Sequence, residues 1–122
     1  MSSIILVIDD NPEAAELLAE VLRMEGRTAI TAYDGANGIV EAHVHRPYAA
    51  IVDILMHGID GYEVARRLRR SFGQDIFLIA LSGQNQREAK QECIKAGFDH
   101  YLQKPANIPE LYSVLRRANR GS

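Results

Sequence analysis

Three acidic residues stand where two apolar stretches of the sequence end. Asp9 and Asp10 follow the apolar run 4–8, and Asp53 closes the run 49–52. A carboxylate beside buried apolar residues is unfavourable by several kcal/mol unless its charge is compensated, so this placement needs an explanation. If the two runs are neighbouring strands, the three carboxylates meet and form a cation site.

Two further polar residues follow apolar runs later in the chain. Ser82 comes directly after the run 76–81, and Lys104 follows the predicted strand 98–102, which has Phe98 and Leu102 at its ends. Oxygen ligands suit Mg²⁺, and no His or Cys ends a strand as a zinc ligand would. The Lys104 ammonium would offset one more negative charge. These residue types fit phosphoryl transfer onto Asp53, which would form an acyl phosphate. Mg²⁺, Lys104 and the Ser82 hydroxyl could position the phosphoryl group and neutralise its charge.

The order of the apolar runs predicts the fold that would bring these residues together. Short apolar runs alternate with segments of helical period, which is typical of parallel strands joined by crossover helices. We expect a flavodoxin-like doubly wound α/β fold, with five helices and a five-stranded parallel sheet in the order 2-1-3-4-5. In such a sheet, ligands bind beyond the carboxyl ends of the strands where the order reverses, between strands one and three.

The boundaries of these elements follow from apolar patterning, caps and breakers. The first helix begins at Pro12 after the Asn11 cap and ends before Gly26. The predicted strands are 4–9, 28–32, 48–54, 76–81 and 98–102, and the other predicted helices are 34–45, 62–71, 86–96 and about 108–119.

Composition narrows the class of protein. The 122 residues are 47% hydrophobic and 25% charged, which predicts one globular domain over residues 1–120, with 121–122 as a tail outside it. The net charge of -2 argues against binding to nucleic acid. No apolar stretch approaches the roughly 20 residues of a membrane span, and the single Cys93 fits a reducing cytoplasm.

Five short motifs in order identify a family. They are Ile-Leu-Val-Ile-Asp-Asp-Asn at 5–11, Val-Asp-Ile-Leu-Met at 52–56, Gly-Ile-Asp-Gly-Tyr-Glu at 58–63, Ala-Leu-Ser-Gly at 80–83 and Tyr-Leu-Gln-Lys-Pro at 101–105. Together they resemble the receiver domain of two-component response regulators, the CheY-like family, over essentially the whole chain. The resemblance implies a signalling switch that catalyses only its own phosphorylation and dephosphorylation.

The resemblance also assigns roles around the acids. It implies that Asp53 accepts a phosphoryl group from a phosphohistidine on a sensor histidine kinase or a histidine phosphotransfer protein. Asp10 would be the main Mg²⁺ ligand and Asp9 would act largely through a bound water. The backbone carbonyl of Leu55 and the Asp53 carboxylate would be the remaining Mg²⁺ ligands that the protein provides.

Switching and docking are implied in the same way. In receivers the hydroxyl residue, here Ser82, turns toward the phosphoryl oxygen, and the aromatic residue, here Tyr101, swings inward behind it. The family also implies a cis bond between Lys104 and Pro105. The phosphodonor protein is expected to dock on the first helix and the following loop, through residues Asn11, Ala14, Leu17 and Pro105.

Some alternatives stay open at this point. His57 stands where receivers usually have proline, and we hypothesise that it makes phosphorylation or its decay pH-sensitive between about pH 6 and 7; the alternative is an exposed turn residue without function. For the whole chain, the alternative is a degenerate receiver that binds partners without phosphorylation. The output partner is unidentified, binding to nucleic acid or membrane is not expected, and the domain is expected to be a monomer or weak dimer. A stand-alone regulator and a receiver cut from a longer protein both fit.

Overall fold

The computed structural model describes residues 3–83 and 87–120. Within these ranges the elements are β1 (Ile4–Ile8), α1 (Pro12–Met24), β2 (Thr28–Ala32), α2 (Gly35–His45), β3 (Ala49–Asp53), α3 (Gly61–Phe72), the short 3-10 helix η1 (Gly73–Asp75), β4 (Phe77–Ser82), α4 (Arg87–Ala96), β5 (His100–Gln103) and α5 (Ile108–Arg120). The strands form one parallel sheet in the order β2-β1-β3-β4-β5, which confirms the predicted topology.

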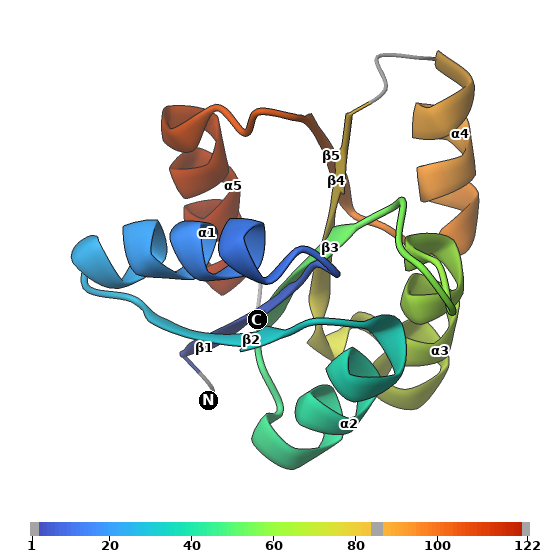
Figure 1. The fold of residues 1–122 in the computed structure, drawn as a ribbon, viewed down its shortest axis with the longest axis horizontal. Helices are drawn as coiled ribbons and strands as arrows, with labels where there is room; N and C mark the ends of the chain where they lie inside the picture. The colour runs from blue at the N-terminus through green and yellow to red at the C-terminus, as the bar shows by residue number, and fades with distance from the viewer. Residues whose placement is uncertain (1–2, 84–86, 121–122) are drawn as a thin grey trace.

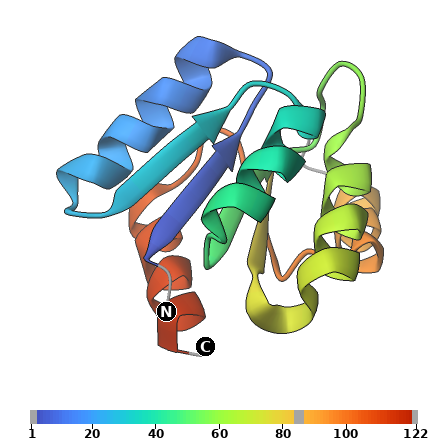
Figure 2. The ribbon, with the colours of Figure 1, turned by 90° about the horizontal axis from the view of Figure 1, so that it is seen from below.

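The helices cover both faces of the sheet (Figure 1). α1 and α5 lie on one face, and α2, α3 and α4 lie on the other, as the view from below also shows (Figure 2). Side chains alternate between the two layers along each strand, so Ile5 and Val7 pack toward α1 and α5, whereas Leu6 and Ile8 pack toward the opposite layer. Because both faces are buried, the central strands β1 and β3 have no alternation of apolar and polar residues, whereas the edge strands β2 and β5 contain polar residues.

Side-chain caps set the starts of α1, α2 and α3, and the Asn107 side-chain oxygen caps α5 by accepting the Glu110 N–H. The side-chain oxygens of Asn11, Asp34 and Asp60 accept hydrogen bonds from backbone N–H groups in the first turns of α1, α2 and α3, respectively. The cap of α3 follows a loop that begins directly after β3. This loop therefore has fixed ends, at Asp53 and at Asp60.

Gly61, the first residue of α3, packs directly against the end of β3. A Cβ atom at this position would lie 2.6 Å from the Asp53 carbonyl oxygen and 2.7 Å from the Ile54 Cα, so only glycine fits without a shift of the backbone. The Gly61 N–H also donates to the Ile54 carbonyl at 3.0 Å. The start of α3 and the end of β3 are thus in backbone contact.

β5 begins two residues later than predicted. Phe98 N–H donates to the Cys93 carbonyl, which completes the C-terminal turn of α4. The next residue, Asp99, uses its carboxylate to accept the Leu78 N–H at 2.8 Å, in place of a backbone carbonyl. Regular pairing with β4 therefore starts only at His100.

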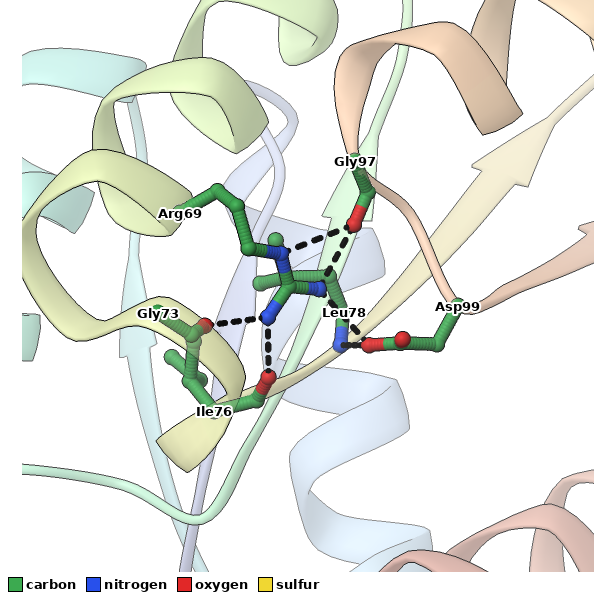
Figure 3. Close-up of polar contacts among 6 residues, drawn as sticks. All are labelled: Arg69, Gly73, Ile76, Leu78, Gly97 and Asp99. Atoms are coloured by element: carbon green, nitrogen blue, oxygen red, sulfur yellow. Dashed lines mark hydrogen bonds and ion pairs between the residues drawn. The ribbon is translucent and has the colours of Figure 1, made fainter.

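The structure adds a short helix, η1, that the sequence did not predict. Its surroundings are organised by the Arg69 guanidinium of α3 (Figure 3), which donates to the carbonyls of Gly73 at 2.5 Å, Ile76 at 2.8 Å and Gly97 at 2.6 and 3.1 Å. It also pairs with Asp99 at 2.8 Å. Arg69 thereby joins the ends of α3 and α4 to the beginning of β4.

The remaining described bounds agree with the prediction or differ from it by one residue. Gln86, the expected first residue of the fourth helix, lies outside the described residues, as does the expected tail 121–122. No helix in the described part of the chain is both long and apolar enough to span a membrane.

Candidate functional site

The three acids meet at one edge of the sheet. β1 and β3 pair in parallel, with Ile8 opposite Val52, so the residues that follow the two strands lie side by side. Asp9, Asp10 and Asp53 can each offer one carboxylate oxygen such that all three oxygens lie within 4.8 Å of one another. Asp9 and Asp53 are buried, with 4% and 6% of their surface exposed, and Asp10 is half-buried.

Lys104 brings a positive charge to the buried acids. Its ammonium nitrogen lies 3.3 Å from Oδ1 of Asp53 and 3.7 Å from Oδ2 of Asp9. The backbone holds this lysine in place: Lys104 directly follows Gln103, the last paired residue of β5, and its N–H donates to the carbonyl of Ser82, the last paired residue of β4, at 2.7 Å. One ammonium group faces two carboxylates here, so an excess of negative charge remains.

Burial, together with this excess of negative charge, raises the pKa of Asp53. Burial of the carboxyl is the largest cause, and the charge of Asp9 adds to it, so the pKa rises to about 6 although the Lys104 ammonium opposes the shift. Asp53 thus takes up a proton more readily than an exposed aspartate does. A bound cation would favour the ionised form instead.

Asp10 is held by the loop that follows β3. Its Oδ2 accepts the backbone N–H of His57 at 2.9 Å and lies 2.8 Å from Nδ1 of the same residue. The backbone hydrogen bond and then the side-chain hydrogen bond lower the pKa of Asp10. Sequence reasoning singled out His57 but did not anticipate this contact, and the pH sensitivity hypothesised for His57 stays a prediction.

The residues present fit a hard divalent cation. Three carboxylate oxygens in reach of one another are the donor set that Mg²⁺ accepts in combination with water. Asp9 is additionally oriented by the Asn11 N–H, which donates to its Oδ1 at 3.0 Å. Asp9, Asp10 and Asp53 are therefore the residues that could hold the ion.

The other predicted site residues lie around this cluster. Ser82 is buried at the end of β4, beside β3, and Tyr101 is half-buried on β5, opposite Ala80. Leu55 lies in the loop after β3 with 60% of its surface exposed. The bond between Lys104 and Pro105 is cis. The switching roles of Ser82 and Tyr101 and the ligand role of the Leu55 carbonyl stay predictions.

An apolar cavity of about 470 Å³ opens next to the acids, between α1 and the residues that follow β5. Asp9 and Lys104 line its polar end, and Ala14, Leu17 and Pro105 line its wall. These last three residues were predicted to meet the phosphodonor, but the cavity itself was not predicted. Leu17, an apolar residue of α1, is nevertheless 66% exposed.

Comparisons with known proteins agree with this architecture. The sequence model described as the response regulator receiver domain matches residues 5–116. The transcriptional regulatory protein TcrA of Mycobacterium tuberculosis is 36% identical over 118 residues, which cover 95% of this chain and 46% of that protein. The response regulator MprA of Mycobacterium ulcerans is 35% identical over 116 residues, which cover 95% of this chain and 50% of that protein. The chain thus spans about half the length of these relatives.

Solved structures are similar over the whole fold. The chemotaxis protein CheY4 of Vibrio cholerae superposes with a TM-score of 0.88 at 25% identity, covering 97% of this chain and 99% of that one. The receiver domain of the Francisella response regulator 1452 also gives a TM-score of 0.88, at 27% identity, covering 99% of this chain and 100% of that one.

Proposed function

Because this chain belongs to the receiver domain family of response regulators, which act in two-component signalling, we propose that it takes a phosphoryl group from a phosphohistidine onto Asp53. The observation that carries the proposal is the position of Asp53: it is buried beside two further acids, with the Lys104 ammonium 3.3 Å from its Oδ1. The single Lys104 ammonium cannot balance three carboxylates, so the site favours a bound cation.

The reaction follows from nucleophilic attack by the carboxylate. An oxygen of ionised Asp53 forms a bond to phosphorus while the bond between phosphorus and the donor imidazole nitrogen breaks, and the electron pair stays on that nitrogen. The product is an acyl phosphate. The Lys104 ammonium, already beside Asp53, is placed to stabilise negative charge on the transferred group.

Three carboxylates and one carbonyl are the proposed ligands of Mg²⁺. Asp10 and Asp53 would hold the ion with the backbone carbonyl of Leu55, and Asp9 would act largely through a bound water. When bound, Mg²⁺ supplies positive charge that offsets the phosphoryl oxygens. Asp10 is suited to its role because its lowered pKa keeps it ionised.

Signal output is proposed to run through Ser82 and Tyr101. The buried Ser82 ends β4 beside Asp53, and the half-buried Tyr101 lies on the neighbouring strand. Movement of the hydroxyl toward the phosphoryl group would allow the ring of Tyr101 to turn inward. The domain would change only its own phosphorylation state, and not convert a separate substrate.

The proposed partner is a sensor histidine kinase or a histidine phosphotransfer protein. It would dock over Asn11, Ala14 and Leu17 and over the Pro105 loop, where the apolar cavity leads to Asp9 and Lys104. An apolar side chain of the partner could fill the cavity while its phosphohistidine faces Asp53. We further propose that residues 1–120 form a cytoplasmic domain that is a monomer or a weak dimer. It would act on a separate output partner and would not bind nucleic acid or membrane.

Acetyl phosphate tests the central claim. Incubation with acetyl phosphate and Mg²⁺, followed by intact-mass measurement, is expected to show one added phosphoryl group on the wild-type protein and on Asp75→Asn, an exposed control on η1. The Asp53→Asn variant is expected to show none. If the wild-type protein gains no phosphoryl group, the chain is a degenerate receiver that binds partners without phosphorylation.

A further inference from the structure

His57 ties the loop after β3 to the end of β1. Two hydrogen bonds from this one residue go to the same oxygen of Asp10: the backbone N–H donates to Oδ2 at 2.9 Å, and Nδ1 lies 2.8 Å from Oδ2. Because an ionised carboxylate only accepts hydrogen bonds, Nδ1 carries the proton in this contact. The imidazole is otherwise fully exposed to solvent, so Asp10 is the partner that orients it.

Two donors on one oxygen restrict how the Asp10 carboxylate can turn. His57 occupies Oδ2 from both its backbone and its side chain, and it does not use Oδ1. The carboxylate is therefore held with one oxygen committed to the loop and the other left to a ligand. Hydrogen bonds of this kind to a ligating carboxylate commonly raise the affinity for metal, since they fix the ligand before the ion arrives.

The same contact fixes the loop itself. Leu55, whose carbonyl is a proposed ligand, lies two residues before His57, in the segment between Asp53 and the Asp60 cap. Between its two ends the loop is also held by Met56 and Ile59, which pack against the core, and the bonds from His57 add a polar tie to Asp10. The bonds from His57 thus bring two ligand-bearing segments, distant in the sequence, into one arrangement.

We propose that His57 is a positioning residue for the cation site: its backbone and imidazole N–H groups clamp Oδ2 of Asp10 and so raise the affinity of the site for Mg²⁺. This inference rests on the proposed function, because it assumes that the three acids bind the ion. The backbone half of the clamp exists only because residue 57 is not proline, which has no N–H group.

Three substitutions separate the two halves of the clamp. His57→Asn keeps a side-chain N–H close to the place of Nδ1, His57→Ala keeps only the backbone N–H, and His57→Pro keeps neither. Calorimetric titration with Mg²⁺, at one fixed pH for all variants, is expected to give a Kd for His57→Asn within about twofold of wild type. We expect the Kd to rise about threefold in His57→Ala and about tenfold in His57→Pro, the lower end of the range for such contacts.

The control is His45→Ala, an exposed histidine on α2, which should bind Mg²⁺ as wild type does. Recovery of affinity in His57→Asn distinguishes a positioning role from general loss of loop structure. Equal or tighter binding in both His57→Ala and His57→Pro would overturn the clamp while leaving the proposed function intact. If the wild-type protein itself binds no Mg²⁺, both the clamp and the proposed cation site are wrong.

Discussion

The ammonium nitrogen of Lys104 lies nearer to Asp53, at 3.3 Å from Oδ1, than to Asp9, at 3.7 Å from Oδ2. The lysine thus pairs first with the residue proposed to accept the phosphoryl group. Its charge is nevertheless outweighed, since burial and the charge of Asp9 raise the pKa of Asp53 to about 6. Without a cation, the ionised site is a source of instability in the fold.

This instability predicts that Asp53→Asn stabilises the metal-free protein at neutral pH. The pKa of Asp53 rises from its ordinary 3.8 to about 6 on folding, so the folded chain binds the proton more tightly. The contribution of Asp53 to stability is therefore fully present below about pH 4 and is lost as the pH rises through about 6. We expect Asp53→Asn to raise the free energy of unfolding by about 1–3 kcal/mol at about pH 8.

Urea unfolding in the presence of EDTA measures this effect. The advantage of Asp53→Asn should shrink toward zero at about pH 4, whereas Asp75→Asn, an exposed acid on η1, should show no comparable dependence on pH. An advantage of equal size at both pH values would contradict the assignment of the raised pKa to Asp53.

Lys104→Met is predicted to slow phosphorylation without abolishing cation binding. The ammonium is lost from beside the phosphoacceptor, and removal of such a charge-stabilising donor lowers a rate by about 10²-fold. Mg²⁺ affinity should be kept or increased, because the substitution removes a positive charge from among the ligands. The rate is read from intact mass over time with acetyl phosphate, and Lys95→Met on the exposed face of α4 is the control. A rate equal to that of the control would exclude a role for Lys104 in the transfer.

Ala14→Glu is predicted to slow phosphoryl transfer from a kinase or phosphotransfer protein. Ala14 lines the apolar cavity beside Asp9, and a charge there should disturb docking of the partner, with an expected loss of about tenfold in rate. Phosphorylation by acetyl phosphate should stay unchanged, since this small donor needs no docking surface. Met24→Glu adds the same charge at an exposed position of the same helix and serves as the control. Unchanged transfer from the protein donor would refute this docking surface.

Arg69→Met is predicted to destabilise the fold strongly. The guanidinium donates to three backbone carbonyls and pairs with Asp99, and these partners would lose their hydrogen bonds (Figure 3). The free energy of unfolding should fall by about 2–4 kcal/mol. The neighbouring Arg70, with 72% of its side chain exposed and only a long 3.6 Å ion pair to Glu63, should change stability by less than about 0.5 kcal/mol on mutation to Met. Similar values for both variants would contradict the structural role of Arg69.

The meeting of the acids was predictable because two independent patterns agree. The continuously apolar runs before Asp10 and Asp53 predict parallel strands buried on both faces, and the doubly wound order makes those strands neighbours. Ser82 and Lys104 follow from the same logic, since each comes at the carboxyl end of a strand. Long, regular patterns of this kind depend little on tertiary detail.

The features that were missed depend on single side chains acting at a distance. The late start of β5 arises because the carboxylate of Asp99 takes the place of a backbone acceptor for Leu78. The short helix η1 lies where the Arg69 guanidinium donates hydrogen bonds to backbone carbonyls of three segments. The contact between His57 and Asp10 joins residues whose side chains meet only after the sheet has formed. None of these contacts has a periodic trace in the sequence.

The glycine at the start of α3 has a mechanical consequence. Gly61 places the helix backbone against the Asp53 carbonyl with no side chain in between, and a backbone hydrogen bond to Ile54 closes the contact. A side chain at such a junction could rotate and absorb a small displacement, whereas two touching backbones act as a stiff joint. Any shift of β3 at Asp53 would therefore be passed on to α3 as a movement of the whole helix.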